Sequence, residues 1–96
     1  MDPQLRGLIE QTIDEGLKPE RVSLLRELAE YFDPVIKSKR DMMFGHLTGY
    51  IAGALPLLTS LLHGRQPTDL EKMEIRDILR RRAQEMIESI ERELAR

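Results

Sequence analysis

The feature that most constrains this chain is an uncharged stretch from Met42 to Leu62, in which three glycines recur every fourth residue. These 21 residues include no Asp, Glu, Lys or Arg. Residues four apart share one face of an α-helix, so Gly45, Gly49 and Gly53 would form a shallow groove that a second helix backbone can approach closely. The pattern predicts a central helix with a partner helix packed on it, and it indicates no particular reaction.

Composition limits the size of the core and the chemistry that the chain can perform. Its 96 residues predict one domain, residues 1–96, with a small interior of Leu, Ile, Met and Ala, because aromatics make up only 4%. Without cysteine there is no disulfide framework, thiolate nucleophile or Cys-ligated metal. The first ten residues include charges in place of an apolar leader, so we expect a cytoplasmic protein. A net charge of −2 argues against a nucleic-acid partner.

Capping and breaking residues divide the first third of the chain into two helices. Asp2 followed by Pro3 predicts a helix start, because Asp caps free N–H groups and Pro fits the first turn. Gly16 is expected to end this helix in the left-handed conformation. A second helix is expected to begin at Pro19 and to be broken at Asp33-Pro34, since the residue before a proline is pushed away from helical dihedrals.

Two longer helices are expected in the rest of the chain. The third should begin at Pro34, with Asp33 as its cap, and should bend near Pro56, which has no N–H to donate. Thr68 and Glu71 fit a capping box that starts a fourth helix running to Arg96. The apolar seam expected on the fourth helix consists of Ile75, Leu79, Ala83, Met86, Ile90 and Leu94. The expected fold is all-α, a bundle of about four helices with a long C-terminal helix.

The uncharged stretch allows a soluble and a membrane interpretation. As a helix it is about 30 Å long, close to the hydrocarbon thickness of a bilayer, so a single span over residues 42–62 is one alternative. Its glycines, hydroxyl groups and proline lower its hydrophobicity, and the stripe of the fourth helix needs a protein surface to cover. We therefore favour a soluble bundle. Because the stretch keeps no charged face for water, we expect a homodimer or higher oligomer to complete the fold around it.

Arg40, Asp41 and His46 are the candidate catalytic residues. A histidine can transfer a proton and an arginine can stabilise the charge of a phosphorane. This R-D-x4-H pattern resembles the Arg-to-His motif of the HEPN-type helical ribonucleases, over about seven residues. The resemblance implies cleavage of RNA at a cleft between two copies, which we keep as an alternative function. The other interpretation is that Arg40 lies at a solvated helix end and His46 is a polar residue beside its neighbours.

The sequence favours neither a metal nor a cofactor. Its only histidines, His46 and His63, are about 25 Å apart on a straight helix, and no Glu-x-x-His pair is present. The glycines fall inside a helical pattern and not in a phosphate-binding turn, so no nucleotide loop is expected. We expect no metal and no cofactor.

Two basic clusters and five methionines have simple structural interpretations. Arg80-Arg81-Arg82 lies among acidic residues, which predicts a solvated face with pairs such as Asp77–Arg81 and Glu88–Arg92. Lys37-Ser38-Lys39-Arg40 is less neutralised but small for nucleic acid. The methionines are expected to fill the core. The sequence thus favours an interaction or scaffold module that associates with itself or with a protein partner, and not an enzyme.

Overall fold

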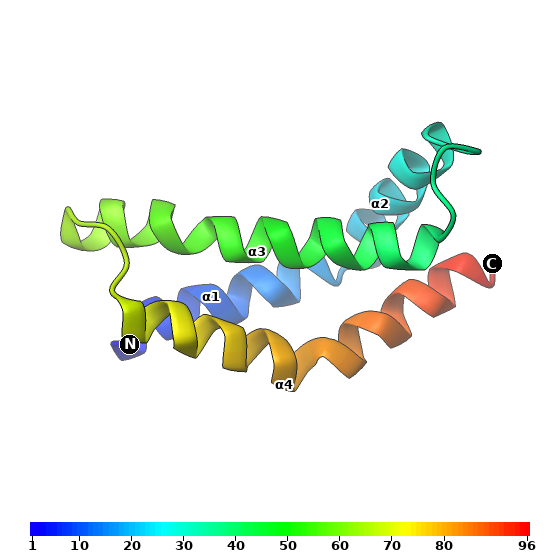
Figure 1. The fold of residues 1–96 in the computed structure, drawn as a ribbon. Helices are drawn as coiled ribbons and strands as arrows, with labels where there is room; N and C mark the ends of the chain where they lie inside the picture. The colour runs from blue at the N-terminus through cyan, green and yellow to red at the C-terminus, as the bar shows by residue number, and fades with distance from the viewer.

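The computed structural model describes residues 1–96 as four α-helices without a β-strand. The helices are α1 (Pro3–Gly16), α2 (Pro19–Tyr31), α3 (Lys39–His63) and α4 (Asp69–Leu94). Figure 1 shows α3 and α4 running antiparallel along the length of the molecule, with α1 and α2 behind them. The prediction of an all-α fold with four helices and a long C-terminal helix is confirmed.

α3 is the centre of the bundle and packs against each of the other three helices. One side of it is buried in a row that we call the inner row, made up of Met43, Leu47, Ile51, Leu55 and Thr59. Ile51 is 0% exposed and belongs to the main core, together with apolar residues of α1 and α4. The inner row follows i+4 spacing, so each member lies one turn from the next along the same side.

α1 begins as predicted and ends differently. The carboxylate of Asp2 accepts a hydrogen bond from the Leu5 N–H at 2.8 Å, as an N-cap should. Gly16 is the last helical residue but is not left-handed, because Gly64 alone has a positive φ. Glycine at position 16 relieves crowding, since a Cβ built there would lie 2.8 Å from Cδ1 of the buried Leu47, whose side chain would have to shift. The prediction of a left-handed stop at Gly16 is wrong.

α3 begins five residues later than predicted and continues through its proline. Residues 32–38 form a turn in which the Val35 N–H donates to the Phe32 carbonyl at 2.7 Å. The hydroxyl of Ser38, and not Asp33, caps the helix by accepting from the Asp41 N–H at 3.1 Å. No kink interrupts α3 at Pro56 in Figure 1, and the proline is exposed while its inner-row neighbours Leu55 and Thr59 stay buried.

α4 confirms the predicted capping box. The Thr68 hydroxyl accepts from the Glu71 N–H at 3.1 Å, and the Glu71 carboxylate accepts from the Thr68 N–H at 2.9 Å. The helix ends at Leu94, two residues before the predicted end. Ile78, which the predicted seam omitted, is buried, because α4 packs against both α3 and α2 and buries more than one narrow stripe.

The arginines of α4 form more ion pairs with α1 than with other residues of α4. Arg82 bonds Asp14 at 2.6 Å and Glu10 at 3.3 Å on α1, and its own neighbour Glu85 at 3.0 Å. These carboxylates, Glu85 first and then Asp14, raise the pKa of Arg82. Neither predicted i+4 pair of α4 forms, and Arg81 pairs with Glu10 instead. The Arg80-Arg81-Arg82 cluster therefore joins α4 to α1 and is more than a solvated face.

Candidate functional site

The predicted glycine groove of α3 is open to solvent. Gly45, Gly49 and Gly53 lie on the side away from the core, and a Cβ built on any of them would meet no atom within 4 Å. The i+4 spacing continues into Leu57 and Leu61, which are 61% and 72% exposed. We call these five residues the outer row. No helix of this chain fills the groove, so within one chain the outer row has no packing partner.

The one close helix contact at a glycine occurs elsewhere, at Gly16 against Leu47. Nothing in the sequence distinguishes Gly16 from an ordinary helix terminator. The continuation of the outer row into Leu57 and Leu61 had a visible signal, namely the same spacing of four residues. Sequence reasoning stopped at the last glycine and missed the two leucines.

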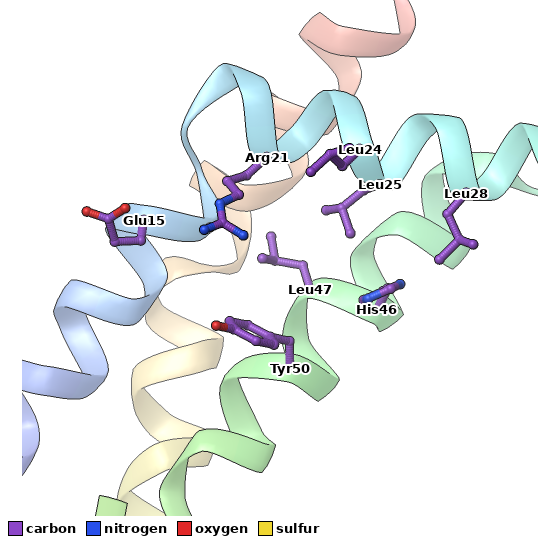
Figure 2. A pocket seen from close by; sticks show the side chains of 9 residues that line it. Glu15, Arg21, Leu24, Leu25, Leu28, His46, Leu47 and Tyr50 are labelled. Carbon is purple, nitrogen blue, oxygen red and sulfur yellow. The ribbon is translucent and has the colours of Figure 1, made fainter. Parts of the chain in front are cut away.

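A cavity of about 330 Å³ lies between α2 and α3, next to the outer row. Its lining includes leucines from both helices, namely Leu24, Leu25, Leu28 and Leu47. Figure 2 shows Leu25 and Leu28 projecting from α2 toward α3, and Leu47 projecting from α3 toward α2. Arg21, His46 and Tyr50 supply polar groups to the same space, and Glu15 lies at its edge. Apolar cavities with a few convergent polar groups are the usual form of small-molecule sites.

The polar groups of this cavity have no partners within the protein. Arg21 makes no salt bridge, while Glu15 at the cavity edge is paired with Lys18 at 3.1 Å. Neither the His46 ring nor the Tyr50 hydroxyl is hydrogen-bonded to another protein group, and Tyr50 is 61% exposed. Sequence reasoning did not identify this cavity, because Arg21 and Tyr50 belong to no motif and come together only when α2 packs on α3.

The candidate catalytic residues do not converge within the chain. Arg40 approaches Asp41 at 3.5 Å and Glu91 of α4, also at 3.5 Å. His46 lies about 1.7 turns further along α3, at the cavity between α2 and α3. The neighbouring Lys39 approaches Asp33 at 3.6 Å, so acidic residues face the Lys37-Ser38-Lys39-Arg40 cluster.

A set of ion pairs joins the far end of α3 to α1 and α4. Arg65, just after α3, binds both carboxylate oxygens of Glu71, at 2.8 and 3.0 Å. These bonds, with the N–H of Thr68, lower the pKa of Glu71 to about 2. His63 bonds Asp2 at 2.7 Å, and the pKa of Asp2 is lowered first by the Leu5 N–H and then by His63.

This end of the molecule has a structural role. Asp2 is paired with His63 and Arg65 with Glu71, and nowhere in the chain do three His, Asp or Glu side chains come together as metal ligands. In addition, no helix combines the length and the apolar character needed to cross a membrane.

Comparison with known protein families, with characterised proteins and with solved structures finds no match to this chain. The class of protein is therefore defined by its fold and surfaces, as a small all-α bundle with an open apolar helix face and a leucine-lined cavity between α2 and α3. These two features are the candidate functional sites.

Proposed function

We propose that this protein is a self-associating interaction module, in which the outer row of α3 packs against the outer row of a second copy. The observation that carries the proposal is the exposure of an uncharged face on the central helix. α3 has no charged residue between Asp41 and His63, and its outer row exposes two large leucines beside three glycines. Water-facing helix surfaces are usually charged, whereas the centres of protein interfaces are depleted of charge.

The outer row is complementary to a reversed copy of itself. It presents glycines at its first three positions and leucines at its last two. If two copies cross antiparallel at Gly53, then Leu57 of each lies against Gly49 of the other, and Leu61 lies toward Gly45. Side chains on i+4 ridges pack into the facing grooves in this manner, and glycine lets the backbones approach closely.

This arrangement has the symmetry expected of a closed dimer. A two-fold axis uses the same patch on both copies, so it leaves no outer row unpaired and does not propagate into a filament. Asp41 and Arg65 lie beyond the two ends of the uncharged stretch, where they can remain in water. The role that follows is that of an interaction or scaffold module whose assembled form presents two copies of each remaining surface.

The same arrangement gives no support to the RNA-cleaving alternative. His46 is seven residues from Gly53, so the two His46 side chains would be about 20 Å apart along the paired helices. Arg40 lies still further from the crossing point and faces Glu91 of its own chain. No shared cleft containing Arg40 and His46 forms, and we propose no cleavage of RNA.

The test is the molar mass of the purified protein, measured by light scattering coupled to size-exclusion chromatography. The wild type is expected to have twice its chain mass of 11.2 kDa. Gly49→Leu should shift the mass toward one chain, because the new side chain occupies the groove that Leu57 of the other copy needs. Gly7→Leu is the matched control, since Gly7 is also an exposed helical glycine without an atom within 4 Å of a built Cβ.

Three results would contradict the proposal. A wild-type mass of one chain at every accessible concentration would show that the outer row remains exposed in solution. An unchanged oligomer in Gly49→Leu would show that the protein associates through another surface. Equal loss of mass in Gly49→Leu and Gly7→Leu would indicate a general effect of added bulk.

A further inference from the structure

The cavity between α2 and α3 combines an apolar interior with one unneutralised cation. Leucines of both helices line it, and the guanidinium of Arg21 projects over it from the first turn of α2. Arg21 makes no ion pair, in contrast to Arg26, Arg65 and Arg82, which all bind carboxylates of this chain. Its charge is therefore available to a ligand in the cavity.

We propose that this cavity binds a small organic carboxylate, with its apolar body among the leucines and its carboxylate on Arg21. The planar guanidinium presents parallel N–H donors that match the two oxygens of a carboxylate. The Tyr50 hydroxyl, which has no partner in the protein, faces the same space and can donate a further hydrogen bond. Desolvating the apolar body against the leucines supplies the non-directional part of the affinity.

The cavity selects against more highly charged ligands. It has one cationic side chain, and the carboxylate of Glu15 lies at its edge. A phosphate dianion would leave charge without a partner and would be repelled by Glu15, whereas one carboxylate balances one guanidinium. A volume of about 330 Å³ is at the small end of known ligand sites, so it suits a molecule with a single ring or a medium alkyl chain.

The inference is independent of self-association. Every lining residue comes from one chain, namely from the end of α1, from α2 and from α3. The outer row is not part of the lining, so breaking the proposed dimer need not alter the cavity. The two proposals can therefore fail separately.

The test is calorimetric titration of the full chain with octanoate, used below the concentration at which it forms micelles. Octanol is the matched neutral probe, because it has the same alkyl chain and lacks the charge. Octanoate is expected to bind at one site per chain and at least about tenfold more tightly than octanol, as a charge-assisted hydrogen bond implies. Amide and side-chain NMR shifts should change at Arg21, His46 and Tyr50.

Variants locate the site. Arg21→Gln, at an exposed position, should weaken octanoate binding about tenfold while leaving octanol binding unchanged. Arg6→Gln is the control, since Arg6 is also exposed, makes no ion pair and lies on α1 away from the cavity. Leu57→Glu, which introduces charge into the outer row, should retain octanoate binding. Circular dichroism confirms that each variant is folded.

The inference would be overturned by no binding of octanoate to the wild type, by equal affinity for octanoate and octanol, or by equal effects of Arg21→Gln and Arg6→Gln. If octanoate binds while the wild type has the mass of one chain, self-association fails and the carboxylate site stands. If Leu57→Glu lost octanoate binding together with its oligomer, the site would depend on the second copy, and the single-chain site proposed here would be wrong.

Discussion

The two sides of α3 follow the same spacing and have opposite environments. The inner row contains large apolar side chains and one threonine, and all of its members are at most 3% exposed. The outer row has glycines at three positions and leucines that are more than half exposed at the other two. Neither row contains a charge. An apolar i+4 row therefore marks a face that packs, but whether the partner is the same chain depends on which helices reach it.

Truncating each row should have the largest and most unequal effects. Ile51→Ala removes a fully buried side chain and is expected to reduce the free energy of unfolding by about 2–5 kcal/mol. Leu57→Ala, on the outer row, should reduce it by less than about 0.5 kcal/mol within one chain, because the side chain is already largely in water. Urea unfolding at a concentration low enough for the protein to be monomeric measures both. Equal losses would mean that the outer row is as buried as the inner row.

The charged end of α3 provides a pH-dependent test of what holds the inner row in place. The pKa of Glu71 is lowered to about 2, from an ordinary value of 4.5, first of all by its bonds to Arg65. A depressed carboxyl pKa stabilises the fold above about pH 4.5, and this stabilisation is lost as pH falls toward 2. Glu71→Gln should therefore be less stable at neutral pH, and its stability should fall less steeply across that window.

Thermal unfolding between pH 2 and 7 measures this dependence. Glu27→Gln is the control, because Glu27 is exposed on α2 and forms no ion pair. A wild-type curve and a Glu71→Gln curve of the same shape would show that the Arg65–Glu71 pair does not hold the end of α3.

The smallest expected effect is the change in melting temperature when a helical glycine is replaced by alanine, and its sign shows whether the outer row is packed. Replacing a solvent-exposed helical glycine by alanine usually stabilises a protein by about 0.5–1 kcal/mol, because glycine loses more entropy on folding. Gly7→Ala should therefore raise the melting temperature. Gly49→Ala should raise it less or lower it, if a second backbone lies close to Gly49 in the dimer. Equal stabilisation by both substitutions would mean that nothing approaches the outer row.

Local features of the fold were predicted well where their cause lies within a few residues. The Asp2 cap and the Thr68–Glu71 capping box formed as expected, since each hydrogen bond joins residues three apart in sequence. The α3 start and the bend at Pro56 were predicted wrongly. At the α3 start a competing local pattern prevailed, because residues 32–38 form a turn and Ser38 caps the helix in place of Asp33. At Pro56 the helix continues, and Leu55 and Thr59 on either side of the proline stay buried.

The candidate sites also differ in how far the sequence predicts them. The outer row was visible as a glycine spacing, and its extension to Leu57 and Leu61 could have been read from the same pattern. The cavity could not have been predicted in this way, because Arg21 and Tyr50 are separated by a turn and a helix boundary, and no spacing relates them. Arg40 and His46, which the sequence suggested as a pair, face different neighbours in the folded chain.

The sequence by itself determined that this chain forms four helices, where most of them begin and end, and that α3 has two uncharged faces. These properties follow from capping, helix-breaking residues and the periodicity of apolar side chains, all of which act over one or two turns. Only the tertiary structure decided which face of α3 is buried, that Leu47 packs closely against Gly16, and that α2 and α3 line a cavity. Those outcomes depend on how distant helices fill space together, and local sequence does not encode that packing in any short pattern.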